Sequence, residues 1–196
     1  MYNKKFAKLF AISILTFSGA AQAITVSANP DATGYELGDT VTIDLTISDL
    51  GNGDAPSIGA FDIDLSYDSS VLNFDSVSFG DSVLGNQLDL WGLGSMAEYA
   101  EGNDYINVFE LSYDDSADLL AMQADEFVLA TFTFTTASEG NSSIGVNIND
   151  LSDAYGTNSL SAETVAGNVQ VVPLPAALPL LVSGIAFVSL RSKRKA

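Results

Sequence analysis

The stretch that decides the fold is TVTIDLTIS (residues 40–48), which is followed by FDIDLSY (61–67). In both segments every second residue is apolar, and the residues between are Thr, Asp or Ser. Such alternation is typical of a β-strand with one face on a core and the other in water. VLATFTFT (128–135) repeats the pattern, and its inward positions are predicted to be Val128, Ala130, Phe132 and Phe134.

Weaker strand signals continue along the chain. SIGVNI (143–148) and AGNVQVV (166–172) alternate less strictly, and clusters of Gly, Asn, Asp, Ser and Pro separate the apolar segments. In VLNFDSVSF (71–79) the apolar positions change parity between Phe74 and Val77, which predicts a β-bulge or a bend.

The fold class follows from these many short strands. Only SADLLAMQADE (116–126) has helical character, for a turn or two at most. Short strands with frequent turns favour an all-β fold, an antiparallel β-sandwich. No second globular domain is indicated, so we expect one sandwich domain over residues 24–171.

The first 23 residues have the features of a secretory signal peptide. Three lysines precede the short apolar core LFAISILTF (9–17), and Ala21 and Ala23 supply the small residues of a cleavage site. This apolar core is too short to span a bilayer. We expect cleavage after Ala23, which implies export.

Charge is distributed very unevenly. All seven Lys and Arg lie in residues 1–23 or 191–196, whereas all 25 Asp and Glu lie between them, so residues 24–171 carry a formal charge of −25. Nucleic acid binding is excluded, because phosphates need Lys and Arg to neutralise them. The chain has no Cys and no His, which removes disulfides, thiol nucleophiles and the commonest general base.

The segments YELGDTVTIDLTIS (35–48) and IGAFDIDLSYDSSVLNFDSVSFGD (58–81) resemble the opening of a bacterial cohesin domain. The resemblance implies a nine-stranded β-sandwich with jelly-roll topology that binds rather than catalyses, with dockerin modules as the family's partners. It is good over residues 24–82 and diffuse beyond, although DEFVLATFTFT (125–135) fits a later strand. The matching positions are Gly38, Asp39, Tyr67, Asp68, Val71, Leu72, Val77 and Gly80.

Residues 172–196 resemble a PEP-CTERM sorting signal in its VPLPA variant. An apolar stretch up to Leu190 follows the motif, and both the motif and the basic terminus match: Val172, Pro173, Leu174, Pro175, Ala176, Arg191, Lys193, Arg194 and Lys195. The resemblance implies handling by an exosortase in a Gram-negative bacterium that makes exopolysaccharide.

Physical arguments support part of that assignment. As a helix, residues 174–190 would be roughly 25 Å long, slightly short of a hydrocarbon core. The basic end would stay in the cytoplasm and leave the acidic domain outside. We therefore expect a single transmembrane helix that anchors the protein in the inner membrane before processing, and a final place in the cell envelope or outside the cell.

The acidic residues are the candidates for a catalytic or a metal site. Asp62 and Asp64 lie on one strand and point the same way, whereas a glycosidase pair flanks a bond from two sides, so a solvated acidic face is the preferred interpretation. Calcium is more plausible, because it takes oxygen ligands. The candidate ligands are Asp49, Asn52 and Asp54, and the alternatives are residues 102–104 and 147–153.

A carbohydrate site has one aromatic candidate cluster. Trp91, the only tryptophan, would stack on a sugar ring if exposed, with Tyr99 and Tyr105 extending the strip. A packed Trp91 that fills the core is the commoner case and the preferred interpretation.

The function predicted from these features is that of an exported, non-enzymatic, cohesin-like module of the envelope or biofilm matrix. It would engage a polysaccharide or a protein partner such as a dockerin. The alternative is a structural or adhesion protein of the matrix whose acidic faces are cross-linked by calcium. A polysaccharide-active enzyme would have only Asp62 and Asp64 as candidate catalytic residues.

Overall fold

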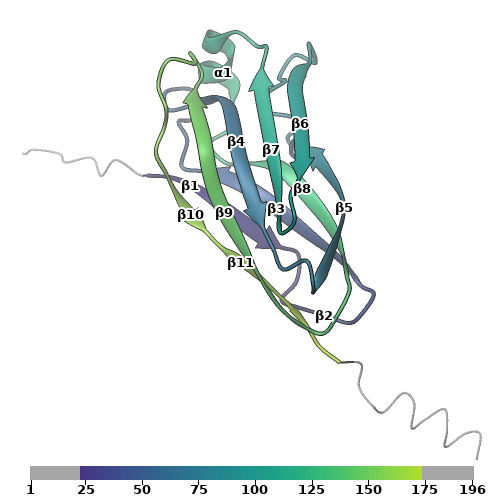
Figure 1. Cartoon of the computed structure of the whole chain (residues 1–196). Coiled ribbons are helices and arrows are strands. Elements are labelled where there is room, and N and C mark those ends of the chain that lie inside the picture. The colour runs from purple at the N-terminus through teal and green to yellow at the C-terminus, as the bar shows by residue number, and fades with distance from the viewer. Residues whose placement is uncertain (1–22, 174–196) are drawn as a thin grey trace, which may run out of the picture.

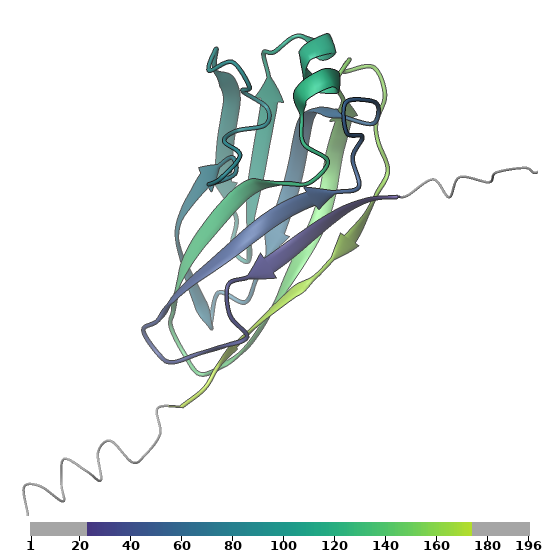
Figure 2. The ribbon, with the colours of Figure 1, turned by 180° about the vertical axis from the view of Figure 1, so that it is seen from behind.

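The structure is a computed structural model that describes residues 23–173. Two sheets pack face to face (Figures 1 and 2). The five-stranded sheet has the order β10-β1-β3-β8-β5, and the six-stranded sheet has the order β2-β11-β9-β4-β7-β6. In the first sheet the strands are β10 (Ala162–Val165), β1 (Ile24–Pro30), β3 (Thr40–Ser48), β8 (Phe127–Thr136) and β5 (Leu72–Phe79). In the second they are β2 (Gly34–Tyr35), β11 (Gly167–Val171), β9 (Gly140–Asp153), β4 (Ile58–Ser66), β7 (Tyr105–Ser112) and β6 (Ser95–Glu101).

The two strands that decide the fold lie inside the sheets, one in each. The inward residues of β3 are fully buried, as are those of β4, and the alternation predicted for both segments is confirmed. Phe134 of β8 packs between the two layers, with its ring centroid 4.9 Å from that of Tyr67 and 5.7 Å from that of Phe74. In the part of the chain that the structure describes, the core side chains run from Ile24 to Val171.

Strand β8 departs from the predicted alternation at its start. The register against β3 shifts between Leu45 and Thr46, which leaves Leu129 as the extra residue of a bulge. Phe127 and Leu129 are therefore buried, whereas Val128 is only half-buried, so the inward orientation predicted for Val128 is wrong. From Ala130 onward the predicted pattern is confirmed.

Strand β5 has the irregularity that its sequence predicts. Its register against β8 shifts between Phe74 and Ser76. The bulge lets Phe74 and Val77 both pack against the core from positions of opposite parity.

The sheets are mixed rather than purely antiparallel, which corrects the predicted fold class. β1 pairs with β10 in parallel, and β11 pairs with β2 in parallel. The cause is the passage of the last segment from one sheet to the other, since β10 joins the first sheet and β11 the second. Eleven strands are present in residues 23–173, against nine expected; one of them, β2, has only two residues.

The helix α1 (Ser116–Met122) caps one end of the sandwich (Figure 1), and its two turns confirm the prediction. The carboxylate of Asp115 accepts from the backbone N–H of Ala117 and begins the helix. Leu119 is its one buried residue, so its packing area is small. Gln123, directly after the helix, attaches it to the sheet: its Oε1 accepts from the N–H of Ile58 at 2.8 Å, and its Nε2 donates to the carbonyl of Ile58 at 3.1 Å.

The far end of the sandwich is where the chain leaves it. Strand β11 ends opposite α1 (Figure 1), and the N–H of Val172 donates to the carbonyl of Tyr35. Within residues 23–173 no helix is long and apolar enough to cross a membrane. Most of the predicted signal peptide and sorting signal lies outside the described residues.

Candidate functional site

The six-stranded sheet turns one side away from the core. We call this side, over β9, β4, β7 and β6, the outer face. The register places side chains of neighbouring strands side by side on it. Asp62 of β4 lies between Phe109 of β7 and Asp150 of β9, and Asp64 lies beside Asn107. Because these strands carry their buried residues on the opposite side, this side chain set faces outward.

Carboxylates and amides form an ordered ladder across the middle of the outer face. The Nδ2 of Asn107 donates to Asp62 Oδ1 at 2.6 Å and to Asp64 Oδ1 at 2.8 Å. The amide of Asn149 donates to the same Asp62 oxygen, and that of Asn147 donates to Asn149. The amides hold both carboxylates in place before any partner arrives.

The geometry of Asp62 and Asp64 does not suit glycosidase catalysis. Asp62 and Asp64 share one amide and point the same way, as predicted, so they do not face each other across a substrate. A glycosidase needs two carboxyl groups on opposite sides of the scissile bond. This pair does not have that arrangement.

Beside the ladder, toward α1, the outer face becomes apolar. Leu111 of β7 lies opposite Met96 of β6 on one side and Ala60 of β4 on the other. Leu111 and Met96 are each 39% exposed, and Phe109 in the next row is half-buried. An apolar band thus borders a row of charged and amide side chains.

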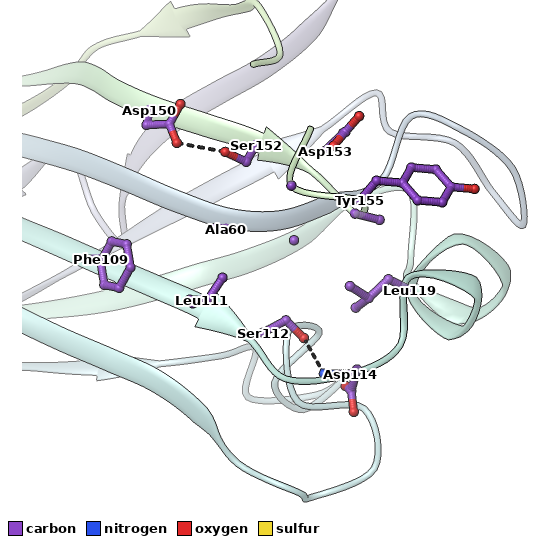
Figure 3. Close-up of a pocket in the computed structure, with 13 residues that line it drawn as sticks. Ala60, Phe109, Leu111, Ser112, Asp114, Leu119, Asp150, Ser152, Asp153 and Tyr155 are labelled. Atoms are coloured by element: carbon purple, nitrogen blue, oxygen red, sulfur yellow. Dashed lines mark hydrogen bonds between the residues drawn. The ribbon is translucent and has the colours of Figure 1, made fainter. Parts of the chain in front are cut away.

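A hollow of about 420 Å³ opens where this band meets α1 (Figure 3). Ala60, Leu111 and Leu119 are among its apolar lining residues, and of these Leu111 is the exposed one; Figure 3 shows the two leucines on opposite sides of the hollow. Asp114 and Asp150 lie at its margin, the first on the connection between β7 and α1 and the second on β9. We call this hollow the α1 pocket.

A third margin carboxylate, Asp153, is committed to the turn that follows β9. It accepts from the side chain of Asn158 at 2.6 Å and from the backbone N–H of Thr157 at 2.9 Å. The bond from the Asn158 side chain, with help from that backbone N–H, lowers the pKa of Asp153. This carboxyl is therefore ionised at neutral pH and shapes the rim.

The other two margin carboxylates have different partners. Within residues 23–173, Asp150 accepts only from the hydroxyls of Ser152 and Ser159, at 2.7 and 3.3 Å. Asp114 Oδ2 accepts from the N–H of Leu90 at 2.6 Å, whereas its Oδ1 is buried and has no hydrogen-bond partner.

Beneath the outer face lies a buried acid that sequence reasoning missed. Glu110 of β7 is fully buried, and its Oε1 accepts from Asn86 Nδ2 and from Ser95 Oγ, each at 2.6 Å, while its Oε2 is unpartnered. Burial raises the pKa of this carboxyl. The sequence does indicate this burial, because Glu110 shares the inward parity of Ile106 and Val108 along β7.

The three predicted aromatic ligand residues do not form one strip. Trp91 is 56% exposed and its Nε1 donates to Asp118 of α1 at 3.0 Å, so its interpretation as core filler is wrong. Tyr105 lies at the start of β7, the end of that strand away from α1 (Figure 1). Its ring covers Gly102, where a Cβ would collide with it. Tyr99 packs edge-on against Phe74 at 5.9 Å.

Two of the predicted calcium ligands have separate partners in the structure. Asp49 accepts from Thr25 Oγ1 and lines a hollow with Asp125 and Glu126, whereas Asp54 accepts from the N–H of Ala55 in its own loop. In the described part of the chain, no group of three or more acidic side chains could hold a metal ion. Calcium binding by Asp49, Asn52 and Asp54 stays a prediction.

Comparison with known proteins gives a consistent result. The family model described as "Cohesin domain" matches residues 26–171. The fold is similar to that of a non-cellulosomal cohesin from the hyperthermophilic archaeon Archaeoglobus fulgidus, with 19% identity, a TM-score of 0.57, and coverage of 77% of this chain and 92% of that one. No curated protein sequence matches the chain.

Two further solved structures extend the comparison. A type I cohesin–dockerin complex from Clostridium thermocellum matches with 15% identity and a TM-score of 0.60, over 77% of this chain and 100% of that one. A type II cohesin domain from the cellulosome of Acetivibrio cellulolyticus matches with 16% identity and a TM-score of 0.58, over 76% and 95%.

Proposed function

The chain belongs to the cohesin domain family, and from that premise we propose that it is an exported, non-enzymatic module that docks a dockerin-type protein on its outer face. Cohesin domains are binding modules without catalytic activity. Of the similar structures, several are complexes in which a cohesin holds a dockerin, which supports a protein of that class as the partner.

The observation that carries the proposal is the composition of the outer face. Protein interfaces join an apolar centre to a polar rim, and this face has an apolar band at Leu111 and Met96 beside the ladder of Asp62 and Asp64. The ladder is already ordered by its amides, so little side-chain entropy is lost when a partner binds. The face is also one side of a hydrogen-bonded sheet, which is a rigid platform.

The ends of the chain suggest where this module works. The signal peptide predicted over residues 1–23 would export it, and the sorting signal predicted over residues 172–196 would bring it to an exosortase and hold it in the inner membrane until processing. The point where the chain leaves the sandwich favours this arrangement, because it lies opposite α1 (Figure 1). The α1 pocket would then lie at the end away from the attachment, and the outer face would flank the sandwich between the two ends. A place in the envelope or exopolysaccharide matrix follows.

A polysaccharide is the second candidate ligand, and the exposure of Trp91 favours it. An indole that is 56% exposed and fixed by a bond to Asp118 offers a flat apolar surface of the kind that stacks on sugar rings.

One experiment separates the two ligands. A protein of residues 24–171 is passed over immobilised dockerins and over immobilised exopolysaccharide, together with the Trp91→Ala variant. The proposal predicts retention on dockerins by both proteins. Retention only on polysaccharide, lost in Trp91→Ala, would replace it with the second candidate, and retention on neither would reject both.

A further inference from the structure

We propose that the α1 pocket receives one cationic side chain, lysine or arginine, from the protein that docks on the outer face. This inference rests on the proposed function and names the chemistry of the partner's anchoring residue. The pocket adjoins the apolar band, so a partner lying on the band is within reach of it.

The apolar surface of the pocket suits an aliphatic stem. Leu111 of β7, which is 39% exposed, contributes it, and the buried residues Ala60 of β4 and Leu119 of α1 also line the pocket (Figure 3). Lysine and arginine bury their methylene groups on such surface while the charged head stays near water. At about 420 Å³, the pocket is large enough to admit one such side chain.

The margin of the pocket supplies the charge. Asp150 and Asp153 on one side and Asp114 on the other are carboxylates, and residues 23–173 contain no Lys, Arg or His to neutralise them. Asp150 is the best placed to pair with an incoming head, because its other contacts are only serine hydroxyls. Asp114 and Asp153 are held by backbone N–H groups of neighbouring loops.

Other ligand classes fit the pocket less well. An anion would be repelled by all three carboxylates. A bare metal ion lacks a ligand set, since no group of three or more acidic side chains in residues 23–173 could hold one. A sugar would leave hydroxyls against the apolar side chain of Leu111. An apolar stem with a positive end matches both the surface and the margin.

The test uses small probes and does not depend on a dockerin. Residues 24–171 are titrated with n-pentylammonium chloride while backbone amide NMR shifts are recorded, with n-pentanol and ammonium chloride as controls. The ammonium probe is expected to saturate shifts at Ala60, Ser112 and Ala154, which line the pocket. The alcohol, which lacks the charge, and ammonium, which lacks the stem, are expected to bind at least several-fold more weakly.

Two matched variants decide the role of the margin. Asp150→Asn is expected to weaken the probe about two- to fivefold, as the loss of one partly exposed ion pair does. Asp75→Asn, on β5 in the other sheet, removes the same charge at a distance and should leave the affinity unchanged. Equal effects of the two variants, equal binding of the alcohol, or no shifts at the three amides would overturn the proposal. None of these outcomes bears on whether a dockerin binds the outer face.

Discussion

Gln123 is the residue through which the binding end can be perturbed most cleanly. It is 2% exposed, and its amide makes three hydrogen bonds, to the N–H and the carbonyl of Ile58 and to the carbonyl of Gln87. Gln123→Met keeps nearly the same volume and removes all three. The change leaves the buried N–H of Ile58 without a partner.

The expected loss follows from the number of bonds. Each hydrogen bond contributes about 0.5 to 1.5 kcal/mol net, and a buried donor left unsatisfied costs about 1 to 3 kcal/mol. We therefore expect the free energy of unfolding to fall by about 2 to 4 kcal/mol. The hydrogen exchange of the α1 amides should also accelerate, because Gln123 is the main attachment of the helix to β4.

The assay is urea unfolding of residues 24–171, analysed by linear extrapolation at constant m. Gln170→Met on β11 is the matched control, since Gln170 is exposed, and its effect should stay within about 0.5 kcal/mol. A loss for Gln123→Met no larger than that of the control would refute the reasoning, as would unchanged exchange in α1.

Three further predictions concern titration and processing. Burial raises the pKa of Glu110 above its usual 4.5. The stability that its protonated form contributes is therefore present below pH 4.5 and is lost as pH rises through the raised value. Glu110→Gln should raise the urea midpoint at pH 7 but not at pH 4, and a lower midpoint at pH 7 would contradict this. Burial acts to raise the pKa of Asp81, but the backbone N–H groups of Leu84, Val83 and Val128 outweigh it and lower that pKa. The stability that this carboxylate contributes is therefore present above pH 3.8 and is lost as pH falls through the lowered value. Asp81→Asn should cost about 1 kcal/mol at pH 7 and flatten the acid limb of the urea midpoint, and an unchanged acid limb would contradict this. Mass spectrometry of the protein recovered from cells should find a C-terminus near Pro175, and an intact Ala196 would reject processing.

The central strands could be predicted because each has one face on the core and one in water. β3 and β4 lie inside their sheets, so burial alternates strictly along them and the sequence carries the same period. Edge strand β6 was not predicted, since its residues are almost all exposed and nothing forces an alternation. The error at Val128 has a different cause, a bulge that is set by pairing with β3 and leaves little trace in the local pattern.

The candidate site was predictable only where one strand supplies it. Asp62 and Asp64 are two residues apart, so their common direction follows from strand geometry alone. The α1 pocket is built from β4, β7, β9 and α1, which are far apart in sequence, and no local pattern announces it. The indole of Trp91 is held by a hydrogen bond to Asp118 of α1, 27 residues further along the chain, and no local pattern predicts that contact.

The most direct test of the account is a binding measurement on two matched variants, with a dockerin retained by residues 24–171. Leu111 lies in the apolar band of the outer face and is 39% exposed, and Val165 lies on β10 of the other sheet and is 50% exposed. Leu111→Asp is expected to raise the Kd at least about 30-fold, as the loss of a hot-spot residue of an interface does, while Val165→Asp leaves it unchanged. Equal Kd values for the two variants, or a larger effect at Val165, would contradict the placement of the partner on the outer face.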